Sequence, residues 1–196
     1  KNTLLLYFRM LLMMAVTLYT SRVVLYKLGI TDYGIYNVVG GIVGMLGFLT
    51  GAMGNAVQRY LSFEIGRGDK ERVNHIFNVS LLAHSVIAVI VLVVMEIAGV
   101  WYLNTFMNIP TDRLDAANWV LQCSILTTMF TIVQVPYNAI IIAKEQMGIY
   151  AYISILEVSL KLAVVYMLSI GDFDKLKLYS VLIMVVTISI LMVYRI

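Results

Sequence analysis

Long apolar runs constrain this chain more than any other feature. Windows of about 20 or more mostly apolar residues cover about 4–26, 35–58, 76–98, 117–141, 149–170 and 176–195, with short connections between them. A helix of about 20 apolar residues crosses a hydrocarbon core of about 30 Å. With 61% hydrophobic and 13% charged residues, the composition is outside the range of a soluble domain. We therefore predict an all-α, polytopic membrane protein with six transmembrane helices.

The ends of the chain suggest a piece of a longer protein. The chain starts at Lys1 without a methionine and stops at Ile196 inside an apolar run. The first apolar window is too long for the apolar region of a signal peptide. We interpret residues 1–196 as one six-helix unit.

The distribution of Lys and Arg between the predicted loops gives an orientation, because cytoplasmic loops are enriched in these residues. One side carries Lys1, Arg59, Arg67, Lys70, Arg72, Lys144 and Arg195, and the other carries Lys27, Arg113, Lys175 and Lys177. The first set is larger, so we predict a cytoplasmic amino terminus. The net charge of +3 reflects this topology and gives no reason to expect nucleic acid as a partner.

Glycines follow a helical spacing in the second window. Gly40, Gly44, Gly47, Gly51 and Gly54 are separated by steps of 4, 3, 4 and 3, which places them on one helix face. In membranes, small residues at such a spacing let two helices approach closely. Two interpretations stay open: a static helix contact, or a smooth groove along which neighbouring helices slide in a moving transporter. Asn55 and Gln58 follow at the polar end of the same helix.

A polar stripe runs along the window 117–141. Ser124, Thr127, Thr131, Gln134 and Asn138 are spaced 3, 4, 3 and 4 apart, with Pro136 among them. Ser and Thr can satisfy their hydroxyls on the carbonyl four residues earlier. Gln134 and Asn138 cannot do so as easily. Because polar groups in a bilayer must face protein or water, these two amides favour a polar cavity.

Charged residues inside the windows are the strongest functional signal, since each costs about 2.5–3.5 kcal/mol in the bilayer on the mildest scale. Four stand out: Arg9 and Arg22 in the first window, and Glu157 and Lys161 in the fifth. Glu157 and Lys161 can neutralise each other at i, i+4, or line a water-filled lumen together with Tyr150 and Ser154. Arg9 can snorkel to the interface. Arg22 can anchor at the outer interface or bind an anion.

Enzyme signatures are missing from the sequence. It contains no HExxH, CxxC or GxSxG motif and no paired carboxylates. His75 and His84 have no acidic or cysteine partners at metal-ligand spacing. We interpret the single cysteine, Cys123, as a small apolar packing residue. We therefore expect no catalytic residues, no metal and no cofactor.

Three longer segments carry a family resemblance. They are SRVVLYKLGITDYGIYNVVGGIV (Ser21 to Val43), GNAVQRYLSFEIGRGD (Gly54 to Asp69) and QVPYNAIIIAKEQMGIYAYISILE (Gln134 to Glu157). In this order and spacing they resemble the polysaccharide transporters, or Wzx-type lipid-linked oligosaccharide flippases, of the multidrug/oligosaccharidyl-lipid/polysaccharide exporter superfamily. The resemblance covers essentially the whole chain.

The resemblance implies a two-lobed exporter of twelve or more helices in the bacterial inner membrane, with this chain as its amino-terminal lobe. Such a protein carries an undecaprenyl-pyrophosphate-linked oligosaccharide from the cytoplasmic to the periplasmic leaflet, for surface polysaccharide biosynthesis. By analogy, Arg22, Lys161 and Arg9 would hold the anionic headgroup, and Asn55, Gln58, Gln134 and Asn138 the sugar hydroxyls. Membrane lipids, a coupling proton or sodium ion, and a polysaccharide polymerase or glycosyltransferases are the expected partners.

Two alternatives remain at this stage. A related exporter for drugs or cations would favour an anionic cavity residue such as Glu157. A non-transporting scaffold for polysaccharide assembly would use the glycine face for static packing. Flipping of a fluorescent lipid-linked sugar, compared with efflux of a cationic dye, would discriminate these functions.

Overall fold

The computed structural model describes residues 2–168 and 174–195, called the described residues below, and these are almost entirely helical. The helices are α1 (Asn2–Gly44), α2 (Gly47–Arg67), α3 (Lys70–Val94), α4 (Val100–Phe106), α5 (Leu114–Ala143), α6 (Met147–Met167) and α7 (Lys175–Arg195). A π-helical turn, Met95–Gly99, joins α3 to α4 without a break, and a single 3-10 turn, Thr111–Arg113, precedes α5. The prediction of an all-α, polytopic helical bundle is confirmed.

Among the described residues, five helical segments are long and apolar enough to cross a membrane. They are Arg9–Gly44, Lys70–Phe106, Thr111–Ala143, Met147–Met167 and Lys175–Arg195. Four of these contain the predicted windows 4–26, 76–98, 117–141 and 176–195 almost completely. The window 149–170 corresponds to α6, and its last two residues lie outside the described residues.

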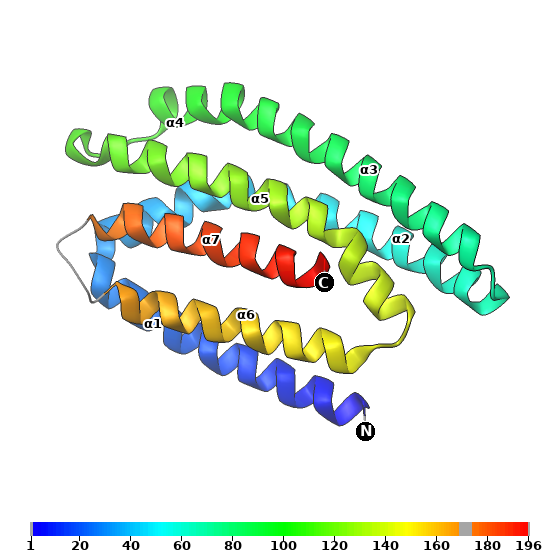
Figure 1. The fold of residues 1–196 in the computed structure, drawn as a ribbon. Helices are drawn as coiled ribbons and strands as arrows, with labels where there is room; N and C mark the ends of the chain where they lie inside the picture. The colour runs from blue at the N-terminus through cyan, green and yellow to red at the C-terminus, as the bar shows by residue number, and fades with distance from the viewer. Residues whose placement is uncertain (1, 169–173, 196) are drawn as a thin grey trace.

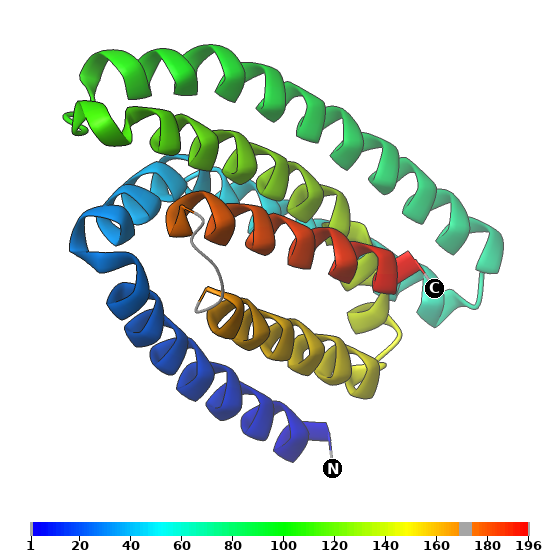
Figure 2. The same cartoon turned by 60° about the vertical axis from the view of Figure 1, so that its left-hand side comes forward.

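The predicted loop at 27–34 is wrong, because helix continues on both sides of a single residue. Gly29 has φ 83° and ψ 170°, and it is the one position inside α1 with non-helical backbone angles. This conformation is essentially restricted to glycine. In Figure 2 the two arms of α1 meet at an angle at this bend. One glycine therefore replaces the whole predicted loop.

The predicted helix 35–58 is also interrupted. The second arm of α1 ends at Gly44, a turn follows at Met45 and Leu46, and α2 begins at Gly47. Glycines flank the turn on both sides, and each interior glycine weakens a helix by about 1 kcal/mol relative to alanine. The continuation, α2, is not among the segments apolar enough to cross a membrane. It carries the polar and charged residues Asn55, Gln58, Arg59, Glu64 and Arg67.

Helix α5 lies at the centre of the bundle and packs against α1, α2, α3, α6 and α7. Three apolar clusters hold this arrangement. The first joins the second arm of α1 to α3 and α5 through residues such as Val39, Ala88 and Leu121. The second joins α1, α6 and α7, and the third joins α2, α3 and α5 around Leu61 and Ala139.

The turns between helices gather at two opposite ends of the bundle (Figure 1). One end holds the amino terminus, the α2–α3 turn and the α5–α6 turn; the other holds the bend of α1, the α4–α5 connection and the start of α7. This is the grouping of loops on which the charge count was based. Which end is cytoplasmic stays a prediction.

An ion cluster ties the second of these ends together. The Arg113 guanidinium forms a two-pronged pair with the Asp32 carboxylate, and its third nitrogen, Nη1, donates to Asp174 Oδ2 at 2.9 Å. Asp174 also caps α7, accepting from Leu176 N at 3.0 Å. One arginine thus joins α1, the start of α5 and the start of α7.

Candidate functional site

Four amide side chains from α2 and α5 converge on one pocket. Asn55 and Gln58 lie on α2, Gln134 and Asn138 lie on α5, and all four line a cavity of about 270 Å³. Its remaining lining residues are small, apolar or hydroxyl-bearing: Thr50, Gly51, Gly54, Thr131, Val135, Ala139 and Ile142. The structure therefore brings together the amides that the sequence placed on two separate helices.

Helical spacing aims these side chains at each other. Gln134 and Asn138 are four residues apart on α5, and the α2 residues Gly51, Asn55 and Gln58 are also three or four apart, so each set shares one face. Gly54 lets the two helices approach, since a Cβ at this position would lie 3.2 Å from Val135 Cγ1. Close backbones hold the amides over a common space.

Hydrogen bonding along α5 separates the hydroxyls from the amides. Thr127 donates to the Cys123 carbonyl at 2.7 Å and Thr131 to the Thr127 carbonyl at 2.8 Å, as expected for threonines in a helix. Asn138 Oδ1 is buried and has no partner among the described residues. An unpaired buried acceptor is destabilising by about 1–3 kcal/mol. This unpaired acceptor belongs to a residue that lines the amide pocket.

Arg9 does not point to the end of the bundle, because its side chain is held on α6. Its Nη1 donates to Ser154 Oγ at 3.0 Å and lies 3.7 Å from Met13 Sδ. The guanidinium also lies over the Tyr150 ring, 4.6 Å from the centroid. Arg9 Nε is buried without a partner among the described residues. Arg9 of α1 thus contacts Tyr150 and Ser154, two polar residues of α6.

Glu157 and Lys161 form the predicted pair, with Lys161 Nζ 2.6 Å from Glu157 Oε1. The pair is not sealed from its surroundings, since the two side chains are 32% and 41% exposed. Lys161 also lines a second pocket of about 240 Å³ between α1, α6 and α7. Lys161 is therefore paired with Glu157 and also borders the second pocket.

The sequence analysis missed the hydroxyls of this second pocket. Thr17, Thr20 and Ser21 of α1 line it opposite Lys161, together with Tyr36 and Tyr179. Thr20 Oγ1 is buried and has no hydrogen-bond partner among the described residues. The signal was present, because Thr17, Thr20 and Ser21 have the i, i+3, i+4 spacing of one helix face. It was overlooked because isolated hydroxyls are common in membrane helices.

Arg22 and most of the predicted packing glycines lie outside the contacts described above. Arg22 is exposed and lines neither the amide pocket nor the second pocket. Of the predicted packing glycines, Gly54 alone meets another helix; an added Cβ would meet nothing within 4 Å at Gly40, Gly44, Gly47 or Gly51. Close packing at those four glycines, and a role for Arg22, stay predictions.

The arrangement is suited to binding rather than to covalent chemistry. The amides can donate and accept hydrogen bonds, and the cations can pair with an anion. No group of three His, Cys, Asp or Glu side chains in residues 2–168 and 174–195 is placed to hold a metal ion. His84 is buried, and its Nδ1 is bonded to the Ser80 carbonyl at 2.7 Å.

Comparison with known families accounts for this architecture. The MatE family model matches residues 6–167, from α1 to the end of α6. The chain belongs to the MatE family. MatE proteins are multi-pass membrane transporters, not enzymes, and couple the movement of their substrates to protons or sodium ions. No curated protein and no solved structure matches the chain.

Proposed function

We propose that this MatE chain is the amino-terminal lobe of a two-lobed flippase of the bacterial inner membrane. It would carry an undecaprenyl-pyrophosphate-linked oligosaccharide from the cytoplasmic to the periplasmic leaflet by alternating access, for surface polysaccharide biosynthesis. The observation that carries the proposal is the amide pocket, in which Asn55, Gln58, Gln134 and Asn138 meet between two helices.

Sugar hydroxyls are the groups that this pocket fits best. Each hydroxyl both donates and accepts hydrogen bonds, and so does each carboxamide. Transfer of an unpaired hydroxyl from water to an apolar medium costs roughly 2–7 kcal/mol. Asn138 Oδ1, which lacks a partner among the described residues, would accept from such a hydroxyl. The lipid tail can stay in the bilayer while the sugar crosses.

The pyrophosphate needs cations along the route. Arg9 of α1 donates to Ser154 of α6, and Lys161 of α6 lines the second pocket. Arg22 is exposed on α1. Arginine forks and ammonium groups replace the hydration of a phosphate. We assign the headgroup to these three residues, with Glu157 setting the position of Lys161.

Glu157, the carboxylate that the cation-efflux alternative favours, argues against that alternative. Its charge is neutralised by Lys161, whereas Glu96 accepts a hydrogen bond from a neutral amide. Gln122 donates to Glu96 at 2.9 Å, and Lys161 pairs with Glu157. A cation carrier needs a carboxylate that is free to receive its cargo. A static scaffold is less well supported, because the glycine face is mostly unpacked in this chain.

Reconstitution of the full-length protein in liposomes tests the proposal. We expect it to flip a fluorescent undecaprenyl-pyrophosphate-linked oligosaccharide and not to transport a cationic dye. The double variant Asn55→Leu with Gln134→Leu should lose flipping, whereas Val133→Leu, a change of apolar for apolar on α5, should retain it. Dye transport without sugar flipping would support the exporter alternative, and neither activity in a folded protein would support the scaffold.

A further inference from the structure

A third pocket lies at the end of the bundle, where the α2–α3 turn meets the end of α5. Its volume is about 340 Å³, and its lining residues are Ile65, Gly68, Asp69, Lys70, Val73, Asn74 and Lys144. None of these residues lines the amide pocket or the second pocket. This pocket is therefore separate from the proposed transport site, and the inference does not rest on the proposed function.

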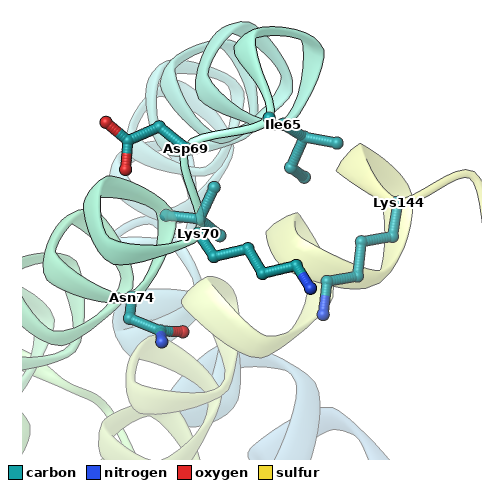
Figure 3. Close-up of a pocket in the computed structure, with 7 residues that line it drawn as sticks. Ile65, Asp69, Lys70, Asn74 and Lys144 are labelled. Carbon is teal, nitrogen blue, oxygen red and sulfur yellow. The ribbon is translucent and has the colours of Figure 1, made fainter.

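Two cations converge in this pocket. Figure 3 shows the side chains of Lys70, at the start of α3, and Lys144, just after α5, with their ammonium groups pointing toward one another. Among the described residues neither lysine belongs to an ion pair. Like charges repel, so an anion placed between the two ammonium groups would stabilise this arrangement.

The one acidic residue of the pocket does not neutralise the lysines. Asp69 Oδ1 caps α3 by accepting from Arg72 N at 3.0 Å, and its other oxygen lies 3.9 Å from Arg72 Nε. In Figure 3 the Asp69 carboxylate points away from both ammonium groups. Because Asp69 already caps the helix, the positive charge of the pocket comes from the lysines and not from the start of α3.

The pocket also has an apolar part. Ile65 and Val73 line it, and Val73 is buried in the cluster that contains Leu61, Ala139 and Ala143. A small soluble anion would leave this surface in contact with water, whereas an acyl chain would cover it. The pocket also lies where two membrane segments end, since one candidate span begins at Lys70 and another ends at Ala143. This is the depth of lipid headgroups.

We propose that this pocket is a binding site for an anionic phospholipid. The phosphate lies between Lys70 and Lys144, the Asn74 amide hydrogen-bonds the headgroup, and the acyl chains follow Ile65 and Val73 toward the bilayer. A bound lipid would join the α2–α3 turn to the end of α5. Helices α2 and α5 also line the amide pocket. The site selects phosphatidylglycerol over the zwitterionic phosphatidylcholine because it supplies two positive charges.

Lipid binding to the purified full-length protein tests the proposal. The probe is phosphatidylglycerol with a fluorescent acyl chain, titrated in phosphatidylcholine micelles. An interfacial lysine contributes about 1 kcal/mol to anionic lipid binding, so Lys70→Gln with Lys144→Gln should weaken binding about thirtyfold. Lys70→Arg with Lys144→Arg should keep it. Lys27→Gln with Lys175→Gln removes the same charge elsewhere and should change it little.

Three results would overturn the proposal. They are equal loss of binding in the two glutamine pairs, the same affinity for phosphatidylglycerol and phosphatidylcholine, and complete displacement by millimolar inorganic phosphate, which would indicate a site for free anions. A second measurement needs no variant: a photoactivatable phosphatidylglycerol should label peptides containing residues 65–74 or 139–144. Labelling confined to other peptides would contradict the site even if the lysine variants fail to fold.

Discussion

Asn138 combines two properties that matter for binding. Its Oδ1 is buried and unpartnered among the described residues, and its side chain lines the amide pocket. The neighbouring threonines on α5 satisfy their own hydroxyls on backbone carbonyls. Under the proposed function, Asn138 would accept a hydrogen bond from the transported sugar.

The first prediction concerns Asn138. Asn138→Leu has nearly the same volume but no hydrogen-bonding group, so flipping of the labelled oligosaccharide should fall about tenfold, the effect of losing a hydrogen bond of about 1–1.5 kcal/mol. Protein stability should not fall, because the variant removes an unpaired buried acceptor. The matched control is Ile142→Leu in the same pocket, which should flip normally. Equal rates for both variants would remove Asn138 from the site.

The second prediction separates structure from transport at Glu157 and Lys161. Either Glu157→Gln or Lys161→Met alone leaves one charge without its partner in the membrane, which should lower the thermal stability of the full-length protein. The double variant should recover stability, since no unpaired charge remains. Flipping should stay low in the double variant, because the second pocket has lost its ammonium group. Recovered flipping would make the pair purely structural.

At the scale of the helix, two glycines have different physical roles. Gly29 provides a backbone conformation, and Gly54 provides space against a neighbouring helix. At the other glycines of the predicted stripe, an added Cβ meets nothing within 4 Å among the described residues, so a packing role there stays a prediction. A spacing pattern gives the face of a helix but not the partner that covers it.

The third prediction concerns the bend of α1. Gly29→Ala places a Cβ in a region essentially restricted to glycine, so the full-length protein should lose about 1–3 kcal/mol of stability. The control is Gly34→Ala, a helical position at which an added Cβ meets nothing within 4 Å. That change should stabilise the helix by about 0.5–1 kcal/mol. Thermal unfolding in detergent checks both, and equal shifts would mean that the bend does not need glycine.

The fourth prediction concerns the contact between α2 and α5. Gly54→Leu should push against Val135 and destabilise the bundle by about 1–3 kcal/mol, a typical cost of overpacking. Gly47→Leu, where the Cβ has open space, should leave unfolding unchanged. Replacing Val135 by alanine should rescue Gly54→Ala if the 3.2 Å contact is the cause. A large loss of stability in Gly47→Leu would instead reveal a partner packed on the glycine face.

At the scale of the whole molecule, the two ends of the bundle are built differently. At one end a single arginine links three segments, as Arg113 joins Asp32 and Asp174. At the other end, Lys70 and Lys144 face each other without a counter-ion among the described residues. The second end also has ion pairs, since Arg72 lies near Glu64 and Asp69, but these pairs do not include the two lysines.

The fifth prediction tests the end that holds Arg113. Arg113→Gln leaves the carboxylates of Asp32 and Asp174 together, at side-chain exposures of 13% and 28%. We expect a loss of about 1–3 kcal/mol, between the values for exposed and buried pairs. Adding Asp32→Asn should restore part of it. Arg67→Gln, which removes an arginine that is 58% exposed, should cost little, and an equal cost would contradict the special role of Arg113.

Much of the fold could be predicted from apolar patterning. The predicted windows match α5, α6 and α7 to within a few residues. The match to α3 is less close, because α3 runs on into the π-helical turn and α4. The second window failed because hydropathy averages over a stretch and does not register a local turn between Gly44 and Gly47. The loop at 27–34 failed because one glycine with a positive φ was enough to turn the chain.

The sequence by itself determined the class of the protein, since the energy of burying polar backbone in a bilayer leaves helices as the solution for long apolar runs. It also determined which side chains share a helix face, because helical periodicity is a local property. Only the tertiary structure decided which faces meet: that α2 and α5 share the amide pocket, that Arg9 lies on α6, and that Arg113 binds two distant aspartates. Such pairings depend on contacts between residues far apart in the chain, and no local pattern encodes them.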